Sequence, residues 1–286
     1  MIISALILGR ITEKISKGDF KMDSKYNATV IGKIMITPDI MVLRVNTDTP
    51  RAEFESGQYT VIGLYGHEAR SVNSGEEHKE SQSDKLIQRA YSIASNRASS
   101  NQMEFYISQV KDGQLTPRVF GLEQGDRLYV SERIVGMFKL SDTPKGFDIA
   151  MVATGTGVAP YISFLRSHIA ENSDINMAVI HGAAHQWDLG YYSELSFLAS
   201  TFPNFHYFPT LTDADETWQG RKLWIKELLE DEILANEANI ATDPEKTHFF
   251  LCGNPKMAEG ISAWLNEYEY EKHSRKVPGA LHVEEF

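Results

Sequence analysis

The chain has 286 residues, 42% of them apolar, and a formal net charge of −11. This length and apolar share predict two domains with separate cores. The single cysteine, Cys252, excludes an internal disulfide and any iron–sulfur cluster held by the chain's own cysteines, and it favours a cytoplasmic protein. The acidic balance without a basic stripe argues against nucleic acid, and no apolar run reaches the roughly 18 residues of a membrane helix.

Charge is unevenly distributed along the chain. Nine basic and 21 acidic side chains give residues 147–286 a net charge of −12, whereas residues 22–146 carry −1. The apolar start, Met1–Leu8, is short and has no basic segment before it, so we expect no signal peptide. We expect an N-terminal extension over 1–25 without an assigned function, one domain over 26–143 and another over 144–286.

The first domain holds six short β-type runs separated by turn signals. They cover residues 28–34, 41–47, 59–65, 89–95, 103–110 and 127–132. Short strands without a long amphipathic helix between them predict a six-stranded antiparallel β-barrel. The polar stretch 66–88 has the composition of a flexible hairpin loop at the surface.

The run Arg89-Ala90-Tyr91-Ser92 combines a cation, an aromatic ring and a hydroxyl. A guanidinium can fork onto phosphate oxygens, and a tyrosine offers a flat ring with a polar tip. The set suits a ligand with a planar ring and a diphosphate, although most matches to so short a motif are ordinary edge strands.

A second anion site is indicated by Gln114-Leu115-Thr116-Pro117. Thr116 suits the N-cap of a helix and Pro117 its first position. The free N–H groups of a helix N-terminus favour an anion such as a pyrophosphate. The plainer interpretation is that Thr116 only caps its helix.

After residue 146 buried-type strands alternate with helices. The strands are 147–153, 176–181, 206–210 and 248–252, and the helices are 161–170, 191–200, 222–235 and 256–268. This alternation predicts a Rossmann-like α/β domain, with a parallel sheet covered on both faces and ligands at the carboxyl ends of its strands. Two glycine motifs follow strands there, although Pro160 stands where a full dinucleotide fingerprint has its third glycine.

Three motifs follow one another in the order of one family: Arg89-Ala90-Tyr91-Ser92, Gly155-Thr156-Gly157-Val158-Ala159-Pro160 and Cys252-Gly253-Asn254-Pro255-Lys256-Met257. From about Ala28 to Phe286 the chain resembles the ferredoxin–NADP(H) reductases, in particular their bacterial flavodoxin/ferredoxin-reducing subclass. The resemblance implies an FAD-binding barrel followed by an NAD(P)-binding domain. It also implies a monomer that passes a hydride from nicotinamide C4 to flavin N5, and then single electrons to a separate acidic ferredoxin or flavodoxin.

The resemblance also implies residue roles. The FAD-binding positions are Arg89, Ala90, Tyr91, Ser92, Tyr106, Gln114, Leu115, Thr116, Thr156 and Phe286, the last covering the isoalloxazine. NADPH or NADH would contact Gly155, Gly157, Ala183, Ala184, Asp213, Arg221, Gly253, Asn254 and Pro255. The catalytic positions are Ser92, Cys252 and Glu284, of which Glu284 would relay a proton or fix Cys252 unless it is a plain carboxylate near the chain end. No metal ion is expected.

The chain departs from the resembling subclass where the 2′-phosphate of NADPH would bind. Three arginines are expected there, but only Arg221 matches, because Ala184 and the acidic run at Asp213 occupy the other positions. Carboxylates repel a phosphate, unless this run is a solvated loop that points away. We therefore expect weak discrimination between the two cofactors, leaning to NADH if to either.

Other functions stay open from the sequence. An NAD(P)H:flavin reductase would release its flavin, whereas the diphosphate set of Arg89 and Thr116 favours bound FAD; an NADH-preferring oxygenase reductase is a further alternative. A non-catalytic flavin-binding regulator would need neither Ser92 nor Cys252. For the carrier, we expect the near-neutral barrel to offer a docking face through Arg97, Lys111 and Arg118.

Overall fold

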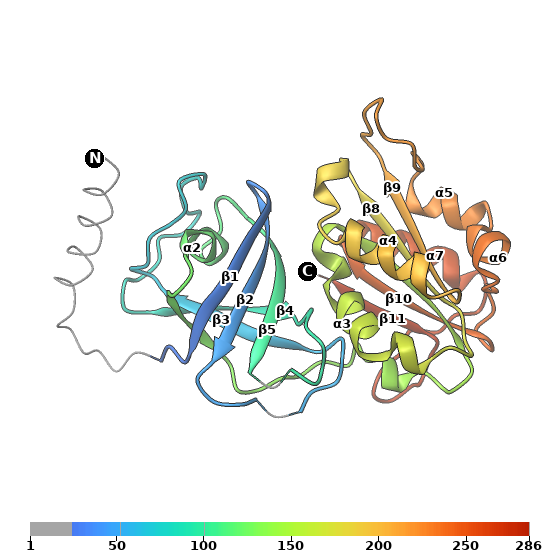
Figure 1. Ribbon diagram of the computed structural model, residues 1–286, viewed down its shortest axis with the longest axis horizontal. Helices are drawn as coiled ribbons and strands as arrows, with labels where there is room; N and C mark the ends of the chain where they lie inside the picture. The colour runs from blue at the N-terminus through green and yellow to red at the C-terminus, as the bar shows by residue number, and fades with distance from the viewer. Residues whose placement is uncertain (1–24, 52, 100, 286) are drawn as a thin grey trace.

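The computed structural model describes residues 25–51, 53–99 and 101–285. An antiparallel sheet and a parallel sheet lie side by side, and the chain returns at its C-terminal end to the space between them (Figure 1). The predicted N-terminal extension lies, apart from Lys25, outside the described residues.

The first sheet is antiparallel and its six strands follow the order β4-β3-β6-β1-β2-β5. The strands are β1 (Ala28–Thr37), β2 (Ile40–Thr47), β3 (Tyr59–Tyr65), β4 (Leu86–Ser92), β5 (Gln102–Ser108) and β6 (Arg127–Val130). All six predicted runs are confirmed as strands, with shifts at their ends. Among the described residues no ladder joins the outer strands β4 and β5; the Ala94 N–H, two residues after β4, donates to the Glu104 carbonyl of β5 at 2.8 Å, so the sheet is barrel-like without being closed.

One core fills the inside of this barrel. Alternate residues of the strands point inward, as the period of two requires, and residues such as Leu43, Ile62 and Phe105 are fully buried. The short helix α2 (Thr116–Gly121) covers one end and buries Val119 and Phe120.

Residues 66–85 are the loop of the β3–β4 hairpin and lie at the surface, as predicted, but the predicted end at residue 88 is too late and the loop is tied to the barrel by hydrogen bonds. Residues 86–88 belong to β4, and the loop before them is held against the segment that leads into α2. The N–H groups of Ser71, Gly75 and His78 donate to the carbonyls of Pro117, Lys111 and Asp112 at 2.8, 2.9 and 3.2 Å. The composition is that of a mobile loop, but these long-range backbone bonds fix it.

The second sheet is parallel and its five strands follow the order β11-β10-β7-β8-β9. They are β7 (Asp148–Thr154), β8 (Met177–Ala183), β9 (Phe205–Leu211), β10 (Thr247–Gly253) and β11 (Leu281–Glu285). The four predicted strands are confirmed, and β11 was not predicted as a strand.

Helices cover both faces of the parallel sheet, as predicted. The helices α3 (Ala159–His168) and α4 (Tyr192–Thr201) pack on one face, and α5 (Ile225–Glu230), α6 (Ile233–Ala238) and α7 (Pro255–Asn266) on the other. The expected single helix over 222–235 is wrong. Glu232 has a φ of 57°, which is left-handed, and an α-helix of L-residues cannot continue through such a residue.

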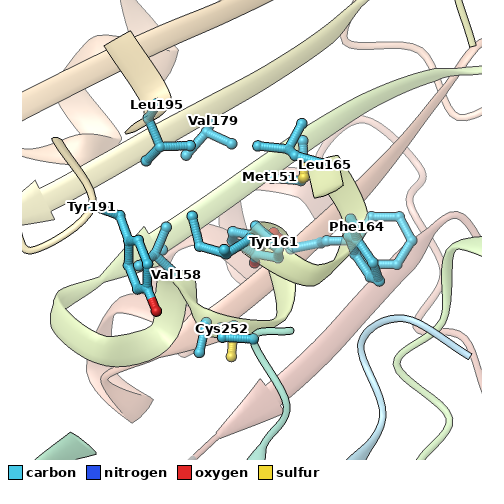
Figure 2. Close-up of a cluster of buried hydrophobic side chains, with 14 of the residues drawn as sticks. Met151, Val158, Tyr161, Phe164, Leu165, Val179, Tyr191, Leu195 and Cys252 are labelled. Atoms are coloured by element: carbon cyan, nitrogen blue, oxygen red, sulfur yellow. Dashed lines mark hydrogen bonds between the residues drawn. The ribbon is translucent and has the colours of Figure 1, made fainter. Parts of the chain in front are cut away.

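The two sheets share one hydrophobic cluster. Tyr161 and Phe164 of α3 are fully buried, and Figure 2 shows them beside Cys252 of β10 and Val158. Phe138, which follows the barrel, stacks on Phe164 with ring centroids 6.0 Å apart. The helix α3 therefore packs on the barrel as well as on its own sheet.

Candidate functional site

A cavity of about 710 Å³ lies where the barrel meets the parallel sheet. Nine of the ten residues predicted to bind the flavin line it, and the structure therefore gathers positions from four separate stretches of the sequence. These nine are Arg89, Ala90, Tyr91, Ser92, Tyr106, Gln114, Leu115, Thr116 and Thr156. The tenth, Phe286, lies outside the described residues.

The three predicted catalytic residues converge at one end of this cavity. The parallel pairing of β10 with β11 sets Cys252 opposite Glu284. The hydroxyl of Ser92 donates to Glu284 Oε2 at 3.0 Å, and Cys252 Sγ lies 4.0 Å from the same oxygen. Ser92 and Glu284 line the cavity, whereas Cys252 is fully buried behind them.

Burial sets the protonation of these groups. It raises the pKa of Glu284, and the hydrogen bond from Ser92 opposes that rise. Burial, reinforced by the charge of Glu284, raises the pKa of the Cys252 thiol well above its ordinary value. Cys252 is therefore a neutral thiol and not a nucleophile.

The other end of the cavity carries a group of hydrogen-bond donors. Arg89 is exposed there, and its guanidinium lies 3.4 Å from the side-chain oxygen of Gln114. The backbone N–H groups of Gln114, Leu115 and Thr116 donate to no protein group within the described part of the chain. A guanidinium facing three free N–H groups is a donor set for phosphate oxygens.

The predicted cap of α2 is wrong in its detail. Thr116 is the first residue of the helix and Leu115 its N-cap, without a side-chain capping bond. The Thr116 hydroxyl instead accepts from the Val110 N–H at 2.9 Å and lies 3.2 Å from the Val110 carbonyl. Because Thr116 ties the segment back to Val110, the N–H groups before the helix stay available.

Aromatic side chains form the walls between the two ends. Tyr91 meets Phe105 edge to face at 6.4 Å, and burial raises its pKa. The Tyr106 hydroxyl donates to the carbonyl of Asp188 at 3.1 Å and accepts from the Gly190 N–H at 2.9 Å, so it also links the barrel to the parallel sheet. Tyr59 lines the cavity too and was missed, because no motif surrounds it in the sequence.

A second cavity, of about 890 Å³, opens at the carboxyl ends of β7, β8 and β9. Of the nine predicted nucleotide positions, Gly155, Ala183, Ala184 and Asn254 line it. Sequence reasoning missed Ile40, Trp224 and Lys256, which also line it; the first belongs to the barrel and only the fold brings it here.

The other glycines act behind the cavity wall. A side chain at Gly157 would place its Cβ 2.2 Å from the Cys252 carbonyl, so the turn after β7 needs glycine to pack on β10. Gly253 has a φ of 130°, which favours glycine, and Pro255 begins α7. Buried His181 supports the same turn: its Nε2 lies 3.0 Å from the Gly155 carbonyl, and burial lowers its pKa to about 4.

Asp213 and Arg221 do not line the second cavity. Arg221 donates to both carboxylate oxygens of Glu237, at 2.7 and 2.6 Å, and lies over the ring of Phe208. His185 Nδ1 contacts the carbonyl of Asp213 at 2.9 Å. The one arginine that matched the resembling subclass is thus committed to a carboxylate, and the roles of Asp213 and Arg221 stay predictions.

One of the three predicted docking cations is not available at the surface. Arg118 is 5% exposed, and its guanidinium donates to the Gly66 carbonyl and to the Glu77 carboxylate of the loop. Lys111 is exposed and pairs with Asp39 at 3.0 Å. Arg97 is exposed beside α3, where its N–H contacts Ser167. Only Lys111 and Arg97 remain candidates.

Within the described ranges, no three histidine, cysteine or carboxylate side chains are grouped so that they could hold a metal ion. In the same part of the chain, no helix combines the length and the apolar character needed to cross a membrane.

Comparisons with known proteins agree with this arrangement. The family "Oxidoreductase NAD-binding domain" matches residues 151–263. The flavodoxin/ferredoxin–NADP reductase of Buchnera aphidicola subsp. Schizaphis graminum is 28% identical over 266 residues, which are 93% of this chain and 100% of that protein. The Escherichia coli protein of the same name is 29% identical over 208 residues, covering 73% and 77%.

Among solved structures, a ferredoxin NADP+ reductase from Neisseria gonorrhoeae with bound FAD and NADP matches with a TM-score of 0.76 at 24% identity. The match covers 92% of this chain and 99% of that one. The antiparallel barrel, the parallel sheet and the two cavities beside them form the two-domain architecture of such reductases, and the matched family and the relatives identify the chain as an oxidoreductase. Over most of its length the chain is similar in sequence to flavodoxin/ferredoxin–NADP reductases, and it shares the fold of a solved member.

Proposed function

We propose that the chain is an FAD-dependent oxidoreductase that moves electrons between NAD(P)H and a ferredoxin or flavodoxin. The observation that carries the proposal is the first cavity, which joins a diphosphate donor set to the Ser92, Glu284 and Cys252 cluster. Arg89 and Ser92 are the two ends of one stretch of β4, and three steps along an extended strand span about 10 Å. A ligand with a diphosphate at one end and a reactive ring at the other fits that separation.

The residues present fit FAD at both ends. Arg89 and the free N–H groups of Gln114 and Leu115 would hold the diphosphate. Tyr91 and Tyr106 would flank the ring system and its ribityl chain. A cavity of about 710 Å³ has the size of a cofactor site.

The second cavity fits a nicotinamide nucleotide. It lies at the carboxyl edge of a parallel sheet, where such sheets bind ligands. Its residue Gly155 is next to Thr156, which lines the first cavity, so one short turn borders both sites. That adjacency supports direct transfer between a nucleotide in one cavity and a flavin in the other.

A bound FAD would supply the redox chemistry, exchanging two electrons as a hydride with a nicotinamide nucleotide and single electrons with a carrier protein. Ser92 Oγ and Glu284 Oε2, 3.0 Å apart, form a path along which a proton can move in either direction. Because burial raises its pKa, Glu284 holds its proton to higher pH than an exposed glutamate does. Neutral Cys252 closes the apolar wall behind them and excludes water.

The finer assignments belong to the same proposal. We place the FAD-binding domain at 26–143 and the nucleotide-binding domain at 144–286, with Phe286 over the flavin ring. We also propose a monomer in the cytosol, which agrees with the single, buried and unpaired thiol of Cys252. Light scattering of the purified protein checks the monomer.

The test is the absorption spectrum of the full-length protein. We expect a yellow protein that keeps stoichiometric FAD through gel filtration and bleaches without oxygen when NADPH or NADH is added. Turnover of cytochrome c should then require added ferredoxin or flavodoxin. A colourless protein that neither binds FAD nor reacts would overturn the proposal, and flavin lost on gel filtration with activity restored by free riboflavin would favour the NAD(P)H:flavin reductase instead.

A further inference from the structure

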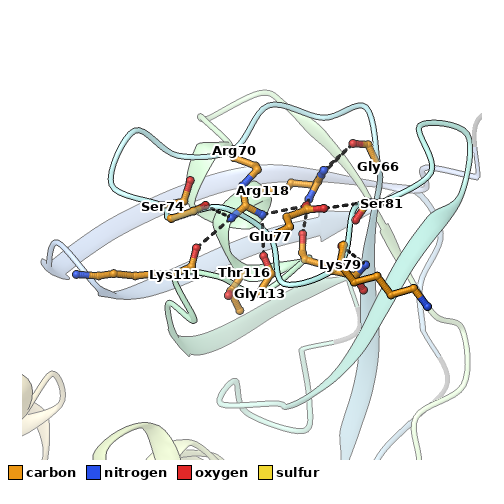
Figure 3. Close-up of polar contacts among 12 residues, drawn as sticks. Gly66, Arg70, Ser74, Glu77, Lys79, Ser81, Lys111, Gly113, Thr116 and Arg118 are labelled. Carbon is orange, nitrogen blue, oxygen red and sulfur yellow. Dashed lines mark hydrogen bonds and ion pairs between the residues drawn. The ribbon is translucent and has the colours of Figure 1, made fainter.

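Residues 66–85 lie over the segment that leads into α2, and two arginines hold them there (Figure 3). Arg70, on the loop, donates to the carbonyls of Lys111 and Gly113 at 3.0 and 2.7 Å. Arg118, on α2, donates to the carbonyl of Gln114 at 2.6 Å. Arg70 of the loop and Arg118 of the helix thus both bind backbone carbonyls of the same short segment, residues 111–114.

Glu77 lies between the two guanidiniums. Its Oε1 accepts from Arg70 at 2.9 Å and also from Arg118, and its Oε2 accepts from the Ser81 N–H at 2.8 Å. The side chains of Glu77 and Arg118 are only 11% and 6% exposed. Without the carboxylate, two poorly solvated cations would face each other, so Glu77 fixes their relative position.

The two arginines determine where the N–H groups of the gripped segment point. In a trans peptide unit the C=O and the N–H lie on opposite sides, and no peptide unit among the described residues is cis. Because Arg70 holds the Gly113 carbonyl, the N–H of Gln114 is turned away from the loop. Arg118 does the same for the Leu115 N–H by holding the Gln114 carbonyl.

These N–H groups belong to the wall of the first cavity. Gln114 and Leu115 both line it, and their N–H groups donate to no protein group within the described residues. The side-chain amide of Gln114 is held as well, because its nitrogen donates to the Lys79 carbonyl of the loop at 3.1 Å. The loop therefore orients a donor segment that the protein itself leaves unused.

We propose that Arg70, Glu77 and Arg118 form a clasp, and that Glu77 is the positioning residue that sets the Gln114 and Leu115 N–H groups for the diphosphate of FAD. This assignment rests on the proposed function. The clasp acts at the Arg89 end of the cavity and not at the Ser92 end. Loss of the clasp should therefore weaken the binding of FAD, which carries a diphosphate, and leave the binding of riboflavin, which carries none, unchanged.

Charge alone predicts the opposite effect of removing Glu77 on the binding of FAD. Glu77 is a negative charge near the anion-binding segment, so replacing it with a neutral side chain should strengthen the binding of an anion if charge alone matters. The clasp predicts weaker binding, because the two arginines lose their shared acceptor and the carbonyls lose their fixed position. The direction of the change distinguishes the two explanations.

The experiment measures binding of FAD and of riboflavin to the full-length protein freed of flavin, by quenching of flavin fluorescence. Glu77→Gln should raise the Kd for FAD about tenfold or more and leave the Kd for riboflavin within about twofold. The matched control is Glu76→Gln, the same change one residue away at an exposed position, which should alter neither. Arg70→Lys keeps the charge but cannot fork onto several acceptors, and it should reproduce the selective loss of FAD.

The outcomes separate the clasp from the proposed function. Wild-type protein that binds no FAD would overturn both. Wild-type protein that binds FAD, with Glu77→Gln binding FAD equally well or more tightly, would overturn the clasp alone. An equal loss of FAD and riboflavin in both Glu77→Gln and Arg70→Lys would also overturn it, because the loop would then support only the fold of the barrel.

Discussion

Glu104 of β5 and Arg166 of α3 form an ion pair of 2.6 Å that joins the barrel to the helix layer of the parallel sheet. The Glu104 side chain is only 6% exposed and also accepts from Arg44 of β2 at 2.6 Å and from the Tyr191 hydroxyl at 2.7 Å. Arg166 in turn donates to Glu194. A nearly buried carboxylate thus neutralises cations from both sides of the junction.

Glu104→Gln should destabilise the protein by about 2–3 kcal/mol, at or below the low end for a broken buried pair because Arg166 is 24% exposed. Urea denaturation followed by fluorescence measures this. The control is Glu123→Gln, whose side chain is 75% exposed in its pair with Lys33 and should change stability by less than about 1 kcal/mol. Equal midpoints for the two variants would show that the junction adds no stability.

The same carboxylate should give the stability a pH dependence. Burial alone would raise the pKa of Glu104, but Arg166 and Arg44 hold it below its ordinary value of 4.5. A carboxylate whose pKa is lower in the folded state stabilises the protein above the unfolded pKa and loses that contribution as the pH falls through the folded pKa. Wild-type protein should therefore lose stability more steeply than Glu104→Gln below pH 4.5.

The Ser92–Glu284 contact predicts a shift in the pH profile of reduction. Because the Ser92 hydrogen bond lowers a pKa that burial has raised, Ser92→Ala should raise the pKa of Glu284 further. A plot of the rate of anaerobic bleaching against pH should show an inflection at the pKa of Glu284. This inflection should move to higher pH in Ser92→Ala and be absent in Glu284→Gln. Stopped-flow measurements over a pH series, with FAD content checked, test this. An inflection that stays in place in Ser92→Ala would remove the contact from the reaction.

Arg89→Ala should lose FAD on gel filtration, because a charge-assisted hydrogen bond contributes roughly 1.5–3 kcal/mol. Lys85→Ala, also exposed and four residues earlier, is the control and should keep its FAD. If Arg89→Ala kept stoichiometric FAD through gel filtration, Arg89 would be an ordinary surface cation without a role in FAD binding.

Cofactor preference should respond to Glu237. We expect weak discrimination between NADPH and NADH in the wild type, and Glu237→Gln should shift the ratio of kcat/KM values toward NADPH by releasing Arg221 for a phosphate. Arg221→Ala should cancel that shift. A strong wild-type preference for NADPH that survives Asp213→Ala would contradict the expectation.

Docking of an acidic carrier should depend on the exposed barrel cations. Arg97→Glu and Lys111→Glu should raise the KM for ferredoxin or flavodoxin and reduce its salt dependence, because rim charges act mainly on association. Lys276→Glu, exposed in the acidic half of the chain, is the matched control. Unchanged kinetics in the first two variants would place docking on another surface.

The sequence predicted most of the fold because its strands and helices are periodic. It failed where order comes from distant partners. The loop 66–85 has a disordered composition, yet Arg70 and Arg118 fix it through carbonyls that no local pattern identifies. The strand β11 was missed because His282 and Glu284 are polar, although His282 is 2% exposed and stacks on Phe250 at 4.2 Å.

The candidate site was predicted chiefly through the family resemblance. Two of the three motifs, Arg89–Ser92 and Gly155–Pro160, and the stretch Gln114–Thr116 contribute walls of the first cavity, and the structure adds Tyr59, which has no motif of its own. The second cavity was predicted less well. Ile40, which lines the second cavity, belongs to the barrel, and Arg221, which was expected there, pairs with Glu237 instead. Neither contact can be predicted from positions along the chain.

The polar junction around Glu104 limits how this protein can be recombined with its relatives. A chimera that keeps this barrel but takes its second half from another reductase retains Glu104 and Arg44, and depends on the donor for an arginine at the position of Arg166. A donor without it would leave the carboxylate with one of its two cations and Ala94 without a donor to its carbonyl. Crossover points for domain exchange should therefore be chosen so that Glu104 and Arg166 are inherited together.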